Sequence, residues 1–146
     1  MRRFLVGLAL VLYVFAANAG PREEALQVLQ KWIKAFADSD VDAIVGLYAP
    51  DALFFGTGSK SLVIRTEGIR TYFEQALLNN RPRGAALREH SIVVLSDTAA
   101  VVTGLDTVTG MRDGKTYSAD GRVTFIVAKR GENWQIVHFH RSAVPS

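Results

Sequence analysis

Apolar residues recur at three- and four-residue spacing just after residue 20, which is the pattern of one face of a long helix. Pro21 and the two acids that follow it favour a helix start at this point, and the pattern ends near Asp38. The same spacing predicts a short second helix from Asp40 to Leu47 and a third helix after Gly68. The apolar positions of the first helix are Ala25, Val28, Leu29, Trp32, Ile33 and Phe36.

The second half of the chain is rich in β-branched residues, arranged in long runs that are separated by turn signals. These runs predict four strands, over residues 86–95, 99–109, 115–129 and 134–144. Asp113-Gly114 is a strong hairpin signal between the second and third of them. Two shorter strands, Ala52–Phe55 and Leu62–Ile64, are expected between the second and third helices. Helices followed by a mainly antiparallel sheet predict an α+β domain.

The amino terminus has the pattern of a secretory signal. Two arginines precede an uncharged apolar run from Phe4 to Ala17, and Ala17-Asn18-Ala19 matches a cleavage site. Residues 1–19 are therefore expected to be a signal peptide and residues 20–146 the mature domain, which would be exported to a periplasm or the cell exterior. After cleavage no stable membrane insertion is expected, and the alternative is an uncleaved anchor.

Composition and charge bear on whether the domain binds nucleic acid and on whether disulfides stabilise it. Omitting Arg2 and Arg3 from the 17 basic residues leaves 15 against 14 acidic ones, so the expected mature domain is almost neutral. No stripe of basic residues is interleaved with aromatic ones, and nucleic-acid binding is therefore not expected. The chain has no cysteine, so the domain must be held by its core without disulfides.

Three segments carry a resemblance to a known family. The run Trp134–Ser142 resembles the closing strand of the association (hub) domain of calcium/calmodulin-dependent protein kinase II. Arg70–Glu74 is similar to that domain's third helix, and Asp97–Ala100 to the turn before its central strand. The hub domain belongs to the NTF2-like, ketosteroid-isomerase-like superfamily. The resemblance implies an NTF2-like cone, in which three N-terminal helices pack on a strongly curved, mostly antiparallel sheet.

The resemblance also implies a ligand pocket inside the cone. Arg141 matches an arginine that points into the hub cavity, where a guanidinium can anchor a small carboxylate. Tyr48 and Tyr72 could add hydroxyls from above the cavity, and Arg122 could add a second guanidinium if the strand register differs. We expect these four residues to bind a small molecule, and the arginines favour an anionic one.

Two observations qualify that pocket. The positions at which the hub family carries further arginines align with Leu105 and Phe125, so the family's multi-arginine pattern is not reproduced here. Arg141 could instead form a structural ion pair with a helix acid such as Glu67 or Glu74.

Strand alternation places Trp134, Ile136, His138 and His140 on one face of the last strand. In the implied fold this is the outer face of the sheet, and we expect it to form the interface of a homodimer or larger ring. His138 and His140 could also reach a metal, but the sequence offers only His90 and scattered acids as further ligands. No metal site and no cofactor are expected.

Whether the domain is an enzyme stays open. Asp106 lies in an apolar, threonine-rich strand, and a carboxyl in the cavity could act as a general acid or base. If Leu105 faces the cavity, Asp106 faces the outer surface, and we favour that arrangement. The expected function is thus an oligomeric module that binds a small molecule, and the alternative is a small isomerase or cyclase.

Overall fold

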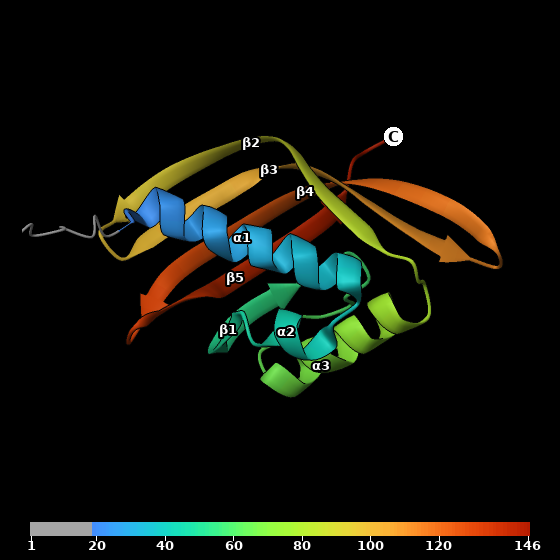
Figure 1. Ribbon diagram of the computed structural model, residues 1–146, viewed down its shortest axis with the longest axis horizontal. Coiled ribbons are helices and arrows are strands. Elements are labelled where there is room, and N and C mark those ends of the chain that lie inside the picture. The colour runs from blue at the N-terminus through green and yellow to red at the C-terminus, as the bar shows by residue number, and fades with distance from the viewer. Residues whose placement is uncertain (1–18) are drawn as a thin grey trace, which may run out of the picture.

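The computed structural model describes residues 19–146, and almost all of the predicted signal segment lies outside this range. Three helices and a π-helical turn are combined with five strands (Figure 1). The elements are α1 (Pro21–Asp38), α2 (Val41–Val45), β1 (Tyr48–Phe55), α3 (Thr66–Phe73), the π-helical turn (Glu74–Leu78), β2 (Gly84–Ser96), β3 (Ala99–Arg112), β4 (Lys115–Arg130) and β5 (Asn133–Ala143).

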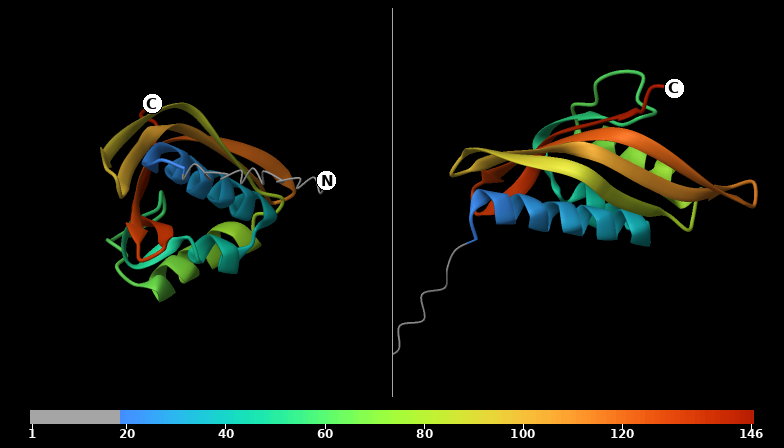
Figure 2. Two further views of the ribbon diagram at one scale, coloured as in Figure 1. Left: turned by 60° about the vertical axis from the view of Figure 1, so that its left-hand side comes forward. Right: turned by 90° about the horizontal axis from the view of Figure 1, so that it is seen from above.

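The strands form one sheet in the order β1-β5-β4-β3-β2. β1 runs parallel to β5, and the other neighbours are antiparallel. The sheet curves around α1, while α2 and α3 close the open side beyond β1 (Figures 1 and 2). The predicted α+β arrangement, with three helices against a curved and mostly antiparallel sheet, is confirmed.

The long helix α1 forms where the apolar spacing predicts it. Pro21 occupies the first turn, and Ser39 ends the helix in the left-handed conformation with φ 54°. The predicted stripe is buried against the concave side of the sheet, where Trp32 stacks on Phe36 and Phe139. No helix within residues 19–146 has the length and apolar composition to span a bilayer.

The segment after α1 differs from the prediction in detail. α2 ends at Val45. β1 begins at Tyr48 rather than at the predicted Ala52, because the chain already pairs with β5 at Tyr48. The expected strand Leu62–Ile64 is reduced to a single bridge between Val63 and Phe54. Its two flanking apolar residues point into solvent, so a longer pairing would bury nothing.

A β-bulge in β5 changes which side chains share a face. Ile126 pairs with His138 and Val127 with Ile136, so Val137 has no partner on β4. One inserted residue reverses the alternation on either side of it. The expectation that Ile136 lies on the outer face with the two histidines is therefore wrong, because Ile136 is fully buried in the core.

Trp134 precedes the bulge and is likewise turned away from the outer face. It is partly buried, packs against the core and lies beside Val28 and Lys31 of α1. The outer face of β5 retains the two histidines, which follow the bulge.

Candidate functional site

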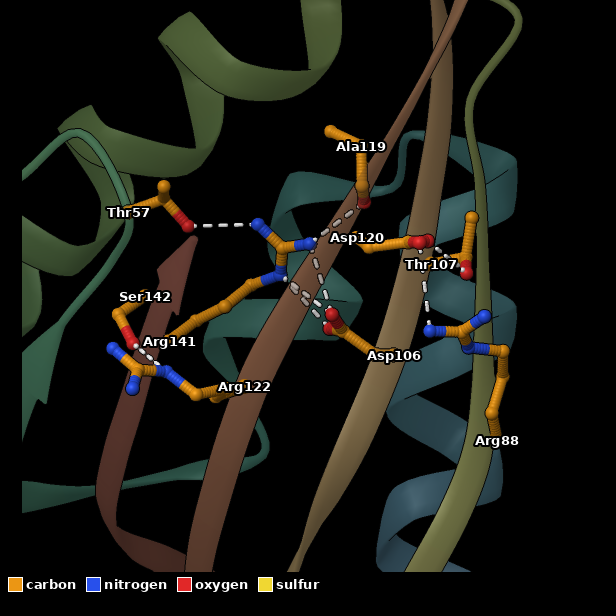
Figure 3. Close-up of polar contacts among 9 residues, drawn as sticks. All are labelled: Thr57, Arg88, Asp106, Thr107, Ala119, Asp120, Arg122, Arg141 and Ser142. Carbon is orange, nitrogen blue, oxygen red and sulfur yellow. Dashed lines mark hydrogen bonds and ion pairs between the residues drawn. The ribbon is translucent and has the colours of Figure 1, made fainter. Parts of the chain in front are cut away.

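Arg141 and Asp106 form a buried ion pair on the inner face of the sheet (Figure 3). The Nε of Arg141 lies 2.9 Å from both carboxylate oxygens of Asp106, and Nη2 is 2.9 Å from Oδ1. Nη1 donates to the Thr57 hydroxyl at 2.8 Å, and Nη2 donates to the Ala119 carbonyl at 2.9 Å. Both side chains are less than a tenth exposed.

Gly121 makes room for this pair. It lies opposite Asp106 in the β3–β4 register. A Cβ at this position would lie 2.5 Å from Cζ of Arg141 and 2.6 Å from Oδ1 of Asp106. The guanidinium thus crosses β4 over a strand position at which no side chain fits.

The position of Asp106 corrects the expectation that it faces outward. Its neighbour Thr107 points to the opposite face, where its hydroxyl donates to Asp120 at 2.7 Å (Figure 3). Asp106 is therefore in phase with the buried residues Val102 and Val108. Threonines and apolar residues occupy both faces of β3, so the sequence pattern alone did not distinguish them.

A cavity of about 380 Å³ lies between the end of α1, α3, and the β3–β4 hairpin. Arg141 reaches it from one side, and Arg83 and Arg112 lie in its wall. None of the described residues that line it is acidic. The lining residues are Phe36, Thr57, Gly58, Tyr72, Gln75, Ala76, Asn80, Arg83, Val108, Arg112, Tyr117 and Arg141.

Arg83 and Arg112 both lie against the ring of Tyr117. Their Cζ atoms are 5.5 Å and 5.2 Å from the ring centre of Tyr117, and Arg83 is also 4.8 Å from that of Phe36. Arg83 donates a hydrogen bond to the Tyr117 hydroxyl. Within residues 19–146 neither arginine forms an ion pair, and Nε of Arg83 is buried without a hydrogen-bond partner.

Tyr72 presents its ring to the cavity from α3. Gly56 allows the loop after β1 to lie directly on this ring, since a Cβ there would lie within 2.4 Å of three Tyr72 atoms. Burial raises the pKa of the Tyr72 phenol, and this outweighs the opposing effects of the Gly58 and Thr57 backbone and of the Arg141 charge. The phenol is therefore neutral at pH 7 and able to donate a hydrogen bond.

The predicted pocket residues divide into two pairs. Arg141 and Tyr72 line the cavity, although the ion-pair partner of Arg141 is Asp106 and not Glu67 or Glu74. Tyr48 and Arg122 do not line it.

Tyr48 lies in the core, and its buried hydroxyl accepts a hydrogen bond from Nε1 of Trp32 at 2.9 Å. Burial raises the pKa of this phenol well above its ordinary value. Arg122 is exposed on the outer face, where Nε donates to the Ser142 hydroxyl at 3.2 Å (Figure 3). The register that would have brought Arg122 inside is not adopted, because Val123 faces inward instead.

Sequence reasoning missed Arg83, Arg112 and Tyr117. The two arginines lie at the ends of β-structure, one just before β2 and one before the Asp113-Gly114 turn. Basic residues at such positions are usually solvated, so the sequence gives no reason to expect them in a pocket. The two arginines reach the same tyrosine because the sheet is curved. The only available signal was the Asp113-Gly114 hairpin, which places Arg112 opposite Lys115 and Tyr117 opposite Gly110.

The outer face of β5 carries His138 and His140. Burial lowers the pKa of His138, and the neighbouring His140 lowers it further. Within residues 19–146 no three His, Asp or Glu side chains gather closely enough to hold a metal ion.

A family model of the SnoaL-like domain matches residues 25–146, which is most of the chain. The chain belongs to the SnoaL-like family. Among solved structures, this SnoaL-like domain is similar to a candidate calcium/calmodulin-dependent protein kinase II association domain from Xanthomonas campestris. The two are 28% identical over 93% of this chain and 99% of the other, with a TM-score of 0.79.

Two further structures show how widely the fold is shared. An NTF2-like superfamily protein from Salmonella enterica is 20% identical over 86% of this chain and 92% of its own, with a TM-score of 0.75. A candidate scytalone dehydratase from Novosphingobium aromaticivorans is only 10% identical over 85% and 84%, with a TM-score of 0.76. The NTF2-like architecture is therefore shown, and the fold alone does not select a chemistry.

Proposed function

We propose that this SnoaL-like domain binds a small anionic molecule in the cavity beside Arg141. The observation that carries this proposal is the composition of the wall: three arginines and no acid among the described residues that line it. Only one of the three is neutralised, since Arg141 is paired with Asp106. A concave site with two uncompensated positive charges attracts anions from solution.

The remainder of the wall suits a small organic molecule. Phe36, Val108 and Ala76 supply apolar surface, and the neutral Tyr72 phenol can donate to an oxygen. A volume of about 380 Å³ is within the usual range of ligand pockets.

Binding is favoured over the enzymatic alternative because of where the carboxyl lies. Isomerase or cyclase chemistry of the expected kind needs a carboxylate and a phenol that converge on one substrate. Tyr72 reaches the cavity, but Asp106 is held by Arg141 and does not line it. The groups that are present can orient a ligand, and none of them is placed as a free base.

The test is calorimetry of the domain with a panel of small organic acids and their neutral amides. At least one acid is expected to bind with a Kd below about 1 mM, and its amide more weakly. Ala76→Leu should abolish that binding by filling the cavity. The control Ala43→Leu adds the same side chain at an exposed position of α2 and should bind as the wild type does. Equal binding by the two variants would refute a ligand site in this cavity.

Self-association is the second part of the proposal, supported by the likeness to proteins described as association and hub domains. In the bulged strand, the outer face that remains consists of His138 and His140 with their neighbours on β1 and β4. Leu53 and Phe55 lie beside them on β1, and Ile126 lies opposite His138 on β4. We call these five residues the outer-face patch, and we propose it as the contact between copies.

Light scattering at micromolar concentration should report a dimer or larger ring. Leu53→Glu should dissociate it, because a charge then replaces an exposed apolar side chain in the patch. The control Leu62→Glu changes an equally exposed leucine outside the patch and should leave the assembly intact. A wild-type monomer would refute this part of the proposal.

Acid should also lower the stability of the folded domain through His138, which lies in the outer-face patch. The surroundings of His138 lower its pKa, so they oppose its protonation. As pH falls below about 6.5, where an ordinary histidine titrates, the unfolded chain takes up protons more readily than the folded one. The folded state therefore loses stability with falling pH, and His138→Gln should reduce that loss.

Export is the third part, and it rests on the Arg-Arg start, the apolar run and the Ala17-Asn18-Ala19 site. Sequencing of exported material should find Gly20 at the amino terminus. An intact Met1 on protein that remains in the cytoplasm would count against it.

A further inference from the structure

We infer that the anion is held by Arg83 and Arg112 around Tyr117 rather than by Arg141, and that the ligand is an aromatic or alicyclic acid with one anionic group on an apolar ring. This inference rests on the proposed function, because it names the ligand class and the anchor of the same cavity. It begins from a difference among the three arginines that line the site.

Arg141 has little capacity left for a ligand. Its Nε and Nη2 face Asp106 and the Ala119 carbonyl, and Nη1 donates to Thr57. Its charge is already balanced inside the protein. An incoming anion would have to compete with a carboxylate that makes contacts of 2.9 Å at two nitrogens.

Arg83 and Arg112 retain their charge, and Arg83 uses one donor, to the Tyr117 hydroxyl. Neither has a carboxylate partner within residues 19–146. Nε of Arg83 is buried with no acceptor, and a buried donor without a partner is costly unless something else supplies one. An anion in the cavity that both arginines line would supply a counter-charge to the two guanidinium groups.

The two guanidinium groups are also held in place. Arg83 lies over Phe36 and donates to Tyr117, and Arg112 lies over the same tyrosine ring. A long side chain fixed before binding loses less entropy when the ligand arrives. The planar fork of an arginine also matches a carboxylate at two points.

The apolar part of the wall argues for a ring on that acid. Phe36, Tyr72 and Val108 face the cavity next to the two arginines. An inorganic anion or acetate would leave this surface in water, whereas a neutral ring would leave the two charges unpaired. One molecule satisfies both halves of the wall if it carries its anion at one end and its ring at the other.

The experiment is calorimetry with three probes: 2-naphthoate, its neutral analogue 2-naphthamide, and acetate. The wild type is expected to bind 2-naphthoate at least tenfold more tightly than either of the others. Arg112→Gln should weaken 2-naphthoate binding about tenfold or more, since each guanidinium makes charge-assisted bonds to the carboxylate. Arg112→Lys should recover only part of the affinity, because the fork is lost.

Arg83→Gln is expected to weaken binding as strongly, and Arg112→Gln remains informative if Arg83→Gln folds poorly. The matched control is Arg122→Gln, which removes the same charge from the outer face and should change the affinity less than twofold.

The outcomes separate the inference from the proposed function. If the wild type binds no acid of the wider panel, the proposed function itself is wrong. If it binds 2-naphthoate and Arg112→Gln behaves like Arg122→Gln, the assignment of the anchor is overturned and the proposed function stands. Acetate that binds as tightly as 2-naphthoate would overturn the ring acid as the ligand class.

Discussion

Two groups of arginine meet in one cavity and differ in what surrounds them. Arg141 is buried, paired with Asp106 and bonded at every nitrogen. Arg83 and Arg112 rest on aromatic rings and have no carboxylate within the described residues. Residue type therefore does not identify an anion anchor, since a paired guanidinium organises the fold and an unpaired one is available to a ligand.

The largest effect should come from breaking the paired group. Asp106→Ala leaves the buried Arg141 without a counter-charge, and the expected loss is roughly 3–5 kcal/mol of unfolding free energy. Denaturant unfolding measures it. The double variant Asp106→Leu with Arg141→Met removes both charges and should recover most of the stability. A loss under about 1 kcal/mol in the single variant would show that Arg141 is solvated and the comparison is mistaken.

Adding a side chain beside Arg141 and Asp106 should reduce the unfolding free energy by less than removing Asp106 does. Gly121→Ala places a Cβ 2.5 Å from Cζ of Arg141, so the guanidinium and Asp106 must shift. Overpacking of this kind costs about 1–3 kcal/mol. Ser118→Ala, an exposed change on the same strand, should stay within about 0.5 kcal/mol. Equal stability of the two variants would mean that the pair does not lie over Gly121.

Salt concentration should affect the unpaired arginines and the Arg141–Asp106 pair differently. Arg112 is exposed and Arg83 is partly exposed, and exposed charges are screened over about 10 Å at 0.1 M salt. Raising the salt from about 0.05 to 0.5 M should weaken the binding of 2-naphthoate several-fold. The cost of Asp106→Ala should remain nearly unchanged, because a buried pair is screened far less. Binding that does not depend on salt would contradict an anchor made of unpaired charges.

The sequence predicted the fold better than the site, and β5 shows why. The helix stripe and the β-rich half depend on local periodicity, and they were confirmed. Ile136 points into the core because of a one-residue bulge, and no local sequence pattern predicts that bulge. Alternation was correct after the bulge, for Phe139 and Arg141, and wrong before it.

The site depends on contacts between distant segments. Arg83 and Arg112 are brought to Tyr117 by the way the β3–β4 hairpin extends past the end of α1 (Figure 1). Asp106 was placed on the wrong face because the resemblance aligns Leu105 with a cavity position, and β3 carries apolar residues on both sides, so its pattern did not correct this. Arg141 and Tyr72 were placed correctly because the resemblance to the hub domain covers their segments.

The smallest expected effect on stability tests the unpaired group. Arg112 is exposed and makes no ion pair, and its contact with the Tyr117 ring is worth about 0.5–1 kcal/mol at most in such a setting. Arg112→Gln should therefore change the unfolding free energy by about 0.5 kcal/mol, and Arg83→Gln by about 1 kcal/mol, since Arg83 also contacts Phe36. Denaturant unfolding of both variants, beside Arg122→Gln, measures the difference. If Arg112→Gln costs more than about 2 kcal/mol, Arg112 is structural like Arg141, and the two groups of arginine are not distinct.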